Sequence, residues 1–514
     1  MRGIYTNVND IRKNVFAEVA KLSYEYDEGF DMEIMHQLPY KIIPGTVAKY
    51  RDSAFLERAI VRERVRLAMG LNLRSYDEYD PITDGVDECT KDETYYEPPL
   101  INIIKFACHK CPDNVMKVTD ACQGCLAHPC KEVCPKDAIS IYDGKSHIDP
   151  EKCIKCGKCK DACAYGAILK MERPCAKSCG MKAISSDEAG CADIDYEKCV
   201  SCGQCLANCP FGAIADKAQI FQTIQAIKSD APVFAAIAPA VTGQFGPDMT
   251  PQKIRSGFKA LGFEDVVEVA IGADLCTISE AEDFVKEVPN EIPFMATSCC
   301  PAWSMMAKKL FPEQAKCISM ALTPMVLTGR LIKKEYPNAK VAFIGPCSAK
   351  KLEAMRRSIR SDIDFVLTFE EVMGMFEAKG VEFDKLEIDH SMHGASADGR
   401  GFAVGGGVAH AVAEYIKENY PDMEIKMEKA DGLDNCRKLL TMAKAGRYNG
   451  YLLEGMACPG GCIAGAGTVQ PIAKTAKAIS DQMNSSSMQH ASTSGYADIL
   501  ETLEERDTQV PAED

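Results

Sequence analysis

The chain has 514 residues, of which 46% are hydrophobic, so it is long enough for two or more domains with large cores. Its formal net charge of −15 argues against nucleic acid and against an acidic membrane surface as partners. Residues 1–20 lack the apolar core of a signal peptide, and the longest apolar run, residues 231–241, is too short to span a bilayer. We therefore expect a soluble, cytoplasmic protein whose 26 clustered cysteines bind metal rather than form disulfides.

Residues 1–100 predict a mostly helical region that ends in an acidic linker. A helix is expected at residues 53–73, and it carries the arginines Arg58, Arg62, Arg64 and Arg66. These arginines could form a docking patch for an acidic partner, but a solvated helix face is the simpler interpretation. Residues 76–99 are acidic and rich in turn-forming residues, which is typical of a linker.

Residues 101–225 contain four copies of the pattern Cys-x3-Cys-x3-Ala-Ile. The cysteine pairs of these copies are Cys130/Cys134, Cys159/Cys163, Cys175/Cys179 and Cys205/Cys209. The accompanying Cys-x2-Cys pairs are Cys108/Cys111, Cys122/Cys125, Cys153/Cys156 and Cys199/Cys202. Two of the combined sets have the spacing of bacterial ferredoxins, in which the fourth cysteine binds the other cluster of a pair. The sixteen cysteines therefore predict ferredoxin-like α+β domains with about four 4Fe-4S clusters, while the isolated Cys108/Cys111 pair also suits tetrahedral zinc.

One consistent assignment distributes these cysteines over four clusters. It groups Cys122, Cys125 and Cys130 with Cys163; Cys153, Cys156 and Cys159 with Cys134; Cys199, Cys202 and Cys205 with Cys179; and it leaves Cys108, Cys111, Cys175 and Cys209 for the fourth. Cys89 and Cys191 have no place in this assignment.

Residues 226–478 alternate between short apolar runs and amphipathic stretches, which is typical of an α/β domain built from βαβ units. The strand-like runs are residues 233–238, 341–344, 365–367 and 451–453. The helix-like stretches are residues 251–261, 279–287 and 408–419. The glycine-rich segment 399–407 fits neither common nucleotide-binding spacing, so tight packing explains it better than phosphate binding. Residues 479–514 are rich in Ser, Met, Asp and Glu and are expected to be disordered.

Three apolar runs of this domain lead directly into segments with cysteine. The segments are residues 297–303 (TSCCPAW, with the only tryptophan), residues 345–347 (GPC) and residues 454–462 (EGMACPGGC). Ligands bind at the carboxyl ends of strands in α/β sheets, so we expect these cysteines to meet at one buried point. Thiolates in such a cavity are soft ligands suited to iron–sulfur chemistry.

These segments, in this order and spacing, resemble the three signature segments of iron-only (FeFe) hydrogenases, and the resemblance covers residues 100–475. It implies an α/β catalytic domain of hydrogenase type, preceded by α+β ferredoxin-like iron–sulfur domains and the mostly helical N-terminal region. It also implies an oxidoreductase that reversibly interconverts H2 with protons and electrons. Ala302, where glycine is commoner, makes the first segment similar to that of the group B branch.

The resemblance also implies a ligand set for the H-cluster. A 4Fe-4S cubane would be held by Cys300, Cys347, Cys458 and Cys462. Cys462 would also bridge to a diiron unit that bears CO, cyanide and an azadithiolate. Gly460 and Gly461, between the last two ligands, would let the backbone approach the bulky cluster without steric cost.

Further roles around the diiron unit follow from the same resemblance. Cys299 would donate a proton to the bridging amine, with a small buried hydrophobic side chain as the alternative interpretation. Lys350 would bond one cyanide, with a surface lysine as the alternative and Lys351 available for that surface role. The remaining matches are a backbone loop near the other cyanide and a methionine near the diiron unit, namely Pro239, Ala240 and Met456.

The family relays protons through a glutamate, a serine and a second glutamate, and Ser319 matches the serine by spacing. The positions of the two glutamates depend on the end of the segment from which one counts. One count places them on residues that cannot carry protons, and the other places them on Ser279 and Glu282. We therefore expect a rerouted path through ordered water and Glu282, with a solvated helix face as an equal alternative. Glu280 and Asp283 are weaker candidates, because adjacent residues face different sides of a helix.

The resemblance also implies partners for the protein, and it leaves two alternative functions open. Electrons would pass through the 4Fe-4S clusters to ferredoxin or a similar small carrier in an anaerobic setting, and dedicated hydrogenase maturation machinery would be a further partner. Gly345 and Met325 stand where the better-known branch has a methionine and a glutamine. The alternatives are a hydrogen sensor of the same fold, although no signalling module is evident, and a narf-like iron–sulfur assembly protein without a diiron unit, although such relatives lack the full set of cysteines.

Overall fold

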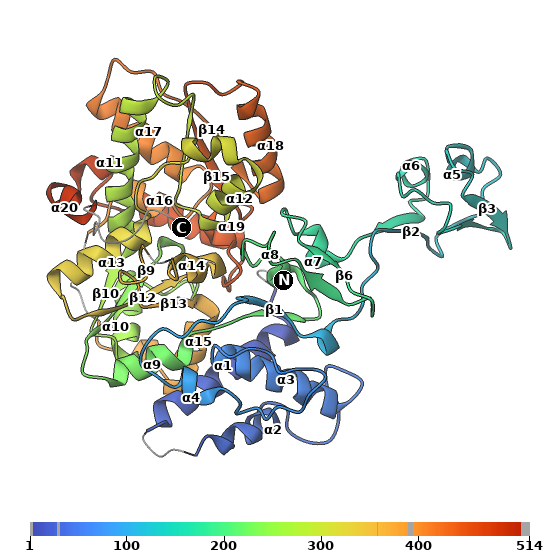
Figure 1. Cartoon of the computed structure of the whole chain (residues 1–514), viewed down its shortest axis with the longest axis horizontal. Coiled ribbons are helices and arrows are strands. Elements are labelled where there is room, and N and C mark those ends of the chain that lie inside the picture. Colours follow the sequence, from blue (N-terminus) through green and yellow to red (C-terminus); the bar gives the residue numbers. More distant parts are fainter. Residues whose placement is uncertain (1–3, 28–30, 357, 389–393, 505–514) are drawn as a thin grey trace.

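A computed structural model describes residues 4–27, 31–356, 358–388 and 394–504 of the chain. Figure 1 shows a large body, from which one small lobe projects on a narrow connection. Among the described residues, the helices are all too short or too polar to cross a bilayer.

The N-terminal region is helical and packs onto the body. Its helices are α1 (Asn7–Glu25), α2 (Leu38–Ile42), α3 (Ala54–Ala68) and α4 (Val86–Cys89). Helix α1 lies along α15 (Phe369–Lys379) and α9 (Ile220–Lys228), which both belong to the body. A Cβ atom on Gly374 would lie 2.5 Å from the Cβ of Phe16, so this glycine permits the close crossing of α1 and α15.

The arginine-rich helix α3 is neither a docking patch nor a solvated face. Arg64 and Arg66 are buried, and Arg66 donates hydrogen bonds to the carbonyl oxygens of Ile82 (2.9 Å) and Asp84 (2.7 Å). Arg64 donates to the carbonyl oxygen of Gly212 in the iron–sulfur region. The guanidinium groups therefore satisfy loop carbonyls that would otherwise be buried without partners.

The segment predicted as an acidic linker is also packed into the body. Ile82, Val86 and Cys89 are buried in the same apolar cluster as α1 and α9. Most acidic residues of residues 76–99 are exposed, so the segment reads as acidic although a few apolar residues and the ion pair of Asp92 with Lys340 (2.6 Å) anchor it.

The iron–sulfur region consists of four small antiparallel strand pairs and short helices. The pairs are β1 (Ile101–Ile103) with β8 (Ile214–Asp216), β2 (Val115–Val118) with β5 (Ile168–Met171), β3 (Ile139–Tyr142) with β4 (Lys145–Ile148), and β6 (Ile184–Ser186) with β7 (Ala192–Ile194). The helices are α5 (Pro129–Glu132), α6 (Lys158–Asp161), α7 (Pro174–Lys177) and α8 (Gln204–Asn208). The part between β2 and β5 forms the projecting lobe of Figure 1.

The repeated Cys-x3-Cys-x3-Ala-Ile pattern has one local structure in all four copies. The first cysteine lies in a short helix, and the isoleucine begins a strand, namely β3, β5, β6 or β8. Between them, the backbone N–H of the alanine donates to the sulfur of the second cysteine at 3.3–3.4 Å; the alanines are Ala138, Ala167, Ala183 and Ala213. The repeat is therefore a unit that turns each second cysteine inward and gives its sulfur a hydrogen-bond donor.

The α/β domain predicted at residues 226–478 contains two parallel sheets. The first has the order β10-β9-β12-β13, with strands β9 (Val233–Ile237), β10 (Asp265–Glu268), β12 (Lys340–Gly345) and β13 (Phe365–Thr368). The second has the order β11-β15-β14, with strands β11 (Met295–Ala296), β14 (Lys426–Asp431) and β15 (Tyr451–Met456). Most of their residues are buried and apolar, as expected for parallel strands covered on both faces, except in the edge strand β14, which is largely polar and exposed.

Helices surround these sheets. They are α10 (Pro251–Leu261), α11 (Val269–Glu287), α12 (Pro301–Leu310), α13 (Pro324–Glu335), α14 (Ser348–Glu353), α16 (Ala397–Gly401), α17 (Gly407–Asn419), α18 (Leu433–Lys444) and α19 (Ile472–Asn484). The helix-like stretch 279–287 is only the second half of α11, which begins ten residues earlier. The glycine-rich segment 399–407 is tightly packed, because a Cβ on Gly399 would lie 2.3 Å from the carbonyl oxygen of Ala270.

The predicted disorder from residue 479 is wrong for the described part of the tail. Helix α19 extends to Asn484, and α20 (Leu500–Glu504) packs on α13 through Leu500 and Leu503, which are buried. Residues 505–514 lie outside the described residues. The predicted boundaries at residues 225 and 478 both fall inside helices, because amphipathic helices join the regions where a change of composition suggested a border.

Candidate active site

A largely apolar cavity of about 840 Å³, including its opening, lies where the two sheets meet. Among the sequence-predicted residues, those lining it are Cys299, Cys300, Cys347, Cys458, Cys462, Lys350, Pro239, Ala240 and Met456. They come from the ends of β9, β12 and β15 and from the segment after β11. Val269, Met325, Phe343 and Phe402 supply much of the remaining wall.

Two of the cysteines stand directly before helices. Cys300 is the residue before α12, and Cys347 is the residue before α14, so backbone N–H groups at these helix starts point toward their sulfurs. The backbone N–H of Ala457 also donates to the sulfur of Cys300 at 3.4 Å. Burial nevertheless dominates, and it raises the pKa of the Cys347 thiol to about 11. A thiolate set in this cavity therefore needs a positively charged iron core to offset its burial.

The only tryptophan holds the cysteine segment in place. Trp303 is fully buried, and its indole N–H donates to the carbonyl oxygen of Thr297 at 3.0 Å. Its ring lies against Gly455 of β15, where a Cβ atom would come within 2.2 Å of the ring. The tryptophan thus fixes the distance between the first and third cysteine segments.

The backbone conformation and the packing at Gly460 and Gly461 both require glycine. Both have left-handed backbone, with φ of +91° and +93°. A Cβ on Gly461 would lie 2.5 Å from the backbone nitrogen of Gly405, whose N–H donates to the carbonyl oxygen of Gly460 at 3.1 Å. The glycines therefore permit a tight turn and close packing on the glycine-rich segment 399–407, and Gly461 also lines the cavity.

The two adjacent lysines are both buried. Lys350 lines the cavity, and its ammonium lies 2.7 Å from the carboxylate of Glu353. Lys351, which was expected at the surface, instead pairs with Asp216 (3.0 Å) and Glu371 (2.5 Å). Lys351 therefore joins the iron–sulfur region, through β8, to the α/β domain.

Glu282 is not in the site, and Glu280 takes the place predicted for it. Glu282 is exposed, and its carboxylate accepts a hydrogen bond from the hydroxyl of Tyr415 at 3.4 Å. Glu280 is fully buried beneath the cysteine pair and accepts hydrogen bonds from the backbone N–H (3.1 Å) and hydroxyl (3.4 Å) of Ser298. Burial raises the pKa of Glu280 to about 7, and hydrogen bonds from Ser298 and Ser319 oppose this shift.

Two further groups lie near Glu280, one toward the cavity and one toward solvent. Toward the cavity, Cys299 is close enough for Glu280 to help raise the pKa of its thiol, after the larger effect of burial. Toward solvent, Asp283 is half-buried one turn along α11, and burial raises its pKa as well. The helix phase could have shown this, because Gly272, Cys276 and Glu280 share the buried face of the full-length α11.

The iron–sulfur region brings its cysteines together in groups. One cavity is lined by Cys108, Cys111, Cys175 and Cys209, and a second by Cys134, Cys153, Cys156 and Cys159. In the third assigned group, the Cys205 thiol interacts electrostatically with Cys202, Cys199 and Cys179, and to a smaller extent with Cys175 of the first cavity. These three groups agree with the sequence-based assignment. Of the remaining cysteines, Cys130 and Cys163 belong to the same apolar cluster as the second cavity.

The third cysteine group touches the catalytic cavity. Cys202 lines that cavity, and the side-chain amide of Gln204 donates to the sulfur of Cys458 at 3.2 Å. Sequence reasoning missed Gln204, because a glutamine inside a Cys-x2-Cys-x2-Cys run carries no signal of its own. The hydrogen bond connects the iron–sulfur region to the candidate active site.

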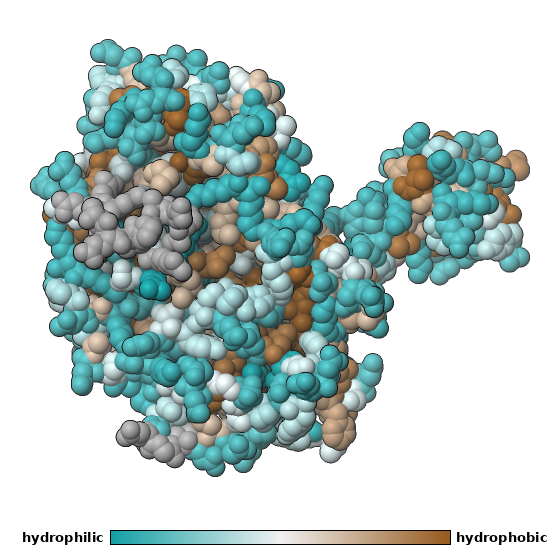
Figure 2. Space-filling model, in the orientation of Figure 1, coloured by the Kyte–Doolittle hydropathy of each residue, from teal (hydrophilic) through white to brown (hydrophobic). Residues whose placement is uncertain are grey.

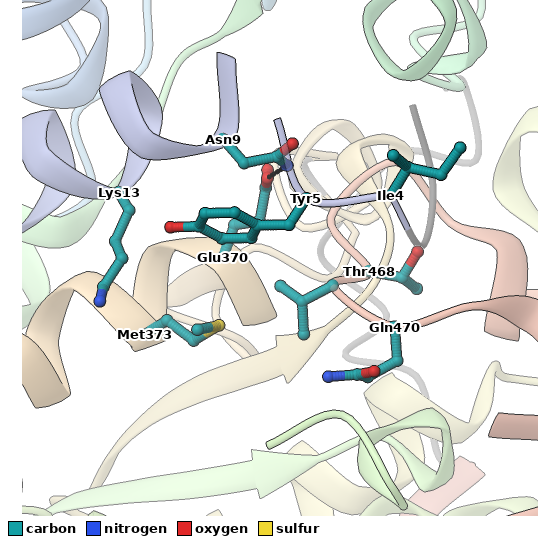
Figure 3. A pocket seen from close by; sticks show the side chains of 9 residues that line it. Ile4, Tyr5, Asn9, Lys13, Glu370, Met373, Thr468 and Gln470 are labelled. Carbon is teal, nitrogen blue, oxygen red and sulfur yellow. Dashed lines mark hydrogen bonds between the residues drawn. The ribbon is translucent and has the colours of Figure 1, made fainter. Parts of the chain in front are cut away.

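A smaller pocket lies elsewhere, between the start of the chain and α15 (Figure 3). Tyr5, Asn9 and Lys13 face Glu370 and Met373 across it, and Asn9 donates to Glu370 at 3.4 Å. It contains no cysteine. This pocket results from the packing of α1 on α15 and is separate from the cysteine-lined cavity.

Comparisons with known proteins identify families and proteins that are similar to this chain. The family model described as "Iron only hydrogenase large subunit, C-terminal domain" matches residues 231–466. "LdpA Fe-S cluster-binding domain" matches residues 169–220, and "4Fe-4S binding domain" matches residues 145–168.

Several curated proteins are similar to long parts of the chain. Iron hydrogenase 1 of Clostridium pasteurianum is 31% identical over 395 residues, which cover 66% of this chain and 68% of that protein. The periplasmic Fe hydrogenase large subunit of Nitratidesulfovibrio vulgaris is 30% identical over 373 residues, which cover 63% and 86%. Cytosolic iron-sulfur assembly component 3 of Pongo abelii is 28% identical over 284 residues, which cover 44% and 59%.

Proposed function

Because this chain belongs to the iron-only hydrogenase family, we propose that it reversibly interconverts H2 with protons and electrons. The observation that carries the proposal is the cavity between the two sheets. Three strand ends that are far apart in the sequence bring five cysteines and one lysine to its wall. An assembly of thiols around an apolar space suits a buried iron–sulfur cofactor better than any organic substrate.

The donors around the cavity fit the H-cluster. Cys300, Cys347, Cys458 and Cys462 would hold the cubane, and Cys462 would also hold the diiron unit with its CO, cyanide and azadithiolate ligands. When bound, the diiron unit would supply the metal centre at which H2 is split heterolytically. The ammonium of Lys350, held by Glu353, supplies a fixed cation for an anionic cyanide, and the apolar wall excludes water.

Protons are proposed to move between the cavity and solvent through Cys299 and Glu280. The Cys299 thiol faces the cavity, and a carboxyl with a pKa of about 7 both gains and loses a proton readily at neutral pH. Ser298 and Ser319 hold this carboxyl in place, and Asp283 offers the next carboxylate toward the surface. Thus we propose Glu280, rather than Glu282, as the first proton relay after Cys299.

Electrons are proposed to pass along four 4Fe-4S clusters in the iron–sulfur region, to and from ferredoxin or a similar small carrier. The contact of Cys202 and Gln204 with the catalytic cavity supports the group of Cys179, Cys199, Cys202 and Cys205 as the last cluster before the active site. Dedicated maturation machinery would install the diiron unit.

Two cavity positions and one glycine before Cys347 support a place in the group B branch. Ala302 and Met325 both line the cavity and are fully buried, so they shape its wall directly. Steric contact explains the glycine at position 345, because a Cβ there would lie 2.4 Å from the ring of Phe343. Phe343 therefore occupies space next to the position where the better-known branch has a methionine.

One alternative function has an observation in its favour, namely the similarity to an iron-sulfur assembly component. Such a protein would hold iron–sulfur clusters without a diiron unit. The test is to mature the protein fully, measure H2 evolution and uptake, and record its infrared spectrum. Bands of CO and cyanide with turnover in both directions support the hydrogenase. A chain with full iron–sulfur content, no such bands and no turnover would support the assembly component instead.

Gln204→Leu is expected to make the reduction potential of the catalytic cubane more negative. The lost N–H···S hydrogen bond stabilises the reduced, more negative cluster, and about 1 kcal/mol corresponds to about 40 mV for a one-electron couple. A redox titration followed by electron paramagnetic resonance measures the shift. Gln123→Leu, an exposed glutamine in the lobe, is the matched control. An unchanged potential in Gln204→Leu would mean that this bond does not tune the cubane.

Cys89→Ser is expected to leave the iron content unchanged. Cys89 lies in the apolar core of the N-terminal region, its thiol donates to the carbonyl oxygen of Val86 at 3.3 Å, and burial raises its pKa to about 12. Cys191→Ser should behave in the same way, although its thiol is beside Cys108. Iron analysis of both variants is the measurement. Loss of about four irons from either one would show that the assignment of clusters is incorrect.

A further inference from the structure

The lobe that projects from the body has a charge opposite to that of the rest of the protein. Residues 115–171 contain nine lysines and seven acidic residues, whereas the whole chain has a net charge of −15. The excess of lysines is concentrated in one stretch. Residues 152–160 read KCIKCGKCK and contain four lysines and no acidic residue. All four lysines are exposed.

These lysines surround the most accessible cysteine of the protein. Cys156 is the only exposed one of the 26 cysteines, all of which lie in the described part of the chain. It lines the second cysteine cavity with Cys134, Cys153 and Cys159. A cluster held there would lie nearest to solvent, and electron transfer between proteins requires such a short path to the surface.

Exposed apolar side chains lie on the same lobe. Leu126 is 97% exposed, Tyr165 is 58% exposed, and Ile154, which lines the cysteine cavity, is 55% exposed. Figure 2 shows apolar patches among hydrophilic side chains on the visible face of the lobe. Apolar side chains with a charged rim are typical of a transient protein–protein interface.

The lysines of residues 152–160 have few partners of their own. Lys152 is 3.8 Å from Asp149, an exposed pair that contributes little. For Lys155 and Lys158, no carboxylate lies within ion-pair distance among the described residues. Their charges therefore remain available to a partner.

We propose that the Lys152–Lys160 loop is the docking surface for a small acidic one-electron carrier protein, which exchanges electrons with the cluster site of Cys134, Cys153, Cys156 and Cys159. The acidic body repels such a carrier, while the basic tip attracts it, so encounters are steered to this one site. One electron moves from the reduced carrier to the oxidised cluster, and no bond forms or breaks. The inference deepens the proposed function, on which it rests for the direction of electron flow.

The test measures cluster reduction, not H2 turnover. The iron–sulfur-loaded, oxidised protein is mixed with a reduced acidic 2[4Fe-4S] ferredoxin at low ionic strength, and cluster bleaching gives the second-order rate constant. Lys155→Glu/Lys158→Glu is expected to lower this rate constant at least tenfold, with the difference shrinking at high salt. Reduction by the methyl viologen radical, a small cation, should not slow down.

The matched control is Lys41→Glu/Lys49→Glu, two exposed lysines beside the arginine-rich helix α3. This control should keep the wild-type rate constant. An unchanged rate constant in the loop variant, or an equal loss in the control, would overturn the proposal. A wild-type dimer that the loop variant lacks would also overturn it, because the loop would then bind the acidic body of a second copy.

The result is independent of the hydrogenase activity. If the protein turned over H2 with viologen while the loop variant kept the wild-type ferredoxin rate, the docking inference alone would fail. If the rate constant fell as expected in a protein without turnover, the docking surface would stand and the proposed function would fail.

Discussion

Cys299→Ala is expected to lower H2 turnover in both directions by a factor of about 10² to 10⁴, the usual contribution of a positioned proton-transfer group. The thiol lines the cavity next to Cys300, and alanine fills nearly the same space without a proton to donate. Iron content and the infrared bands of the mature protein should stay unchanged, because Cys299 is outside the proposed ligand set.

Cys276→Ala is the matched control for this variant. Cys276 is a fully buried cysteine of α11 that does not line the cavity, so its loss removes a thiol of the same size from the same neighbourhood. It should keep turnover per iron close to that of the wild type. Near-normal turnover in Cys299→Ala, with intact infrared bands, would show that another group delivers protons to the site.

Glu280→Gln should lower turnover by a similar factor of about 10² to 10⁴ while cluster content stays unchanged. Glutamine keeps an oxygen that accepts from Ser298, so the shape of the site survives and only the titrating proton is lost. The pH profile should lose the limb that reflects the group with a pKa of about 7. Glu282→Gln, two residues away and exposed, is the control and should keep full turnover.

We also expect Glu280→Gln to change how the stability of the fold depends on pH. Burial raises the pKa of Glu280 from 4.5 to about 7, so the folded chain binds this proton more tightly than the unfolded chain does. Its contribution to stability is therefore full below about pH 4.5 and is lost as the pH rises to about 7, by roughly 3 kcal/mol in total. Urea unfolding at pH 5 and pH 8 should show a smaller loss for Glu280→Gln. An equal loss in both proteins would mean that Glu280 does not carry this effect.

If Glu282→Gln rather than Glu280→Gln abolished turnover, the proton route would leave α11 on its exposed face. The hydroxyl of Tyr415 would then be the next group in line, since it is the partner of Glu282 at 3.4 Å. Equal loss in both variants would point to a general effect on α11 instead of a relay.

The amino-acid sequence by itself determined which cysteines come together. Cys-x2-Cys and Cys-x3-Cys spacings specify compact turns, because a few residues of backbone fix where two sulfurs lie relative to each other. Apolar runs followed by Gly, Pro and Cys specify buried strands with ligands at their carboxyl ends. For this reason the cysteines that line the main cavity, and three of the four cysteine groups in the iron–sulfur region, could be predicted without a structure.

Only the tertiary structure decided which face of each helix is buried. Glu280 and Glu282 differ by two positions, or about half a turn, and the true start of α11 at Val269 sets which of them faces the cysteines. Likewise, Arg64 and Lys351 look like surface residues, but carbonyls and carboxylates from distant segments bury them with partners. Short-range pattern specifies local geometry, whereas burial depends on what distant parts of the chain place opposite each side chain.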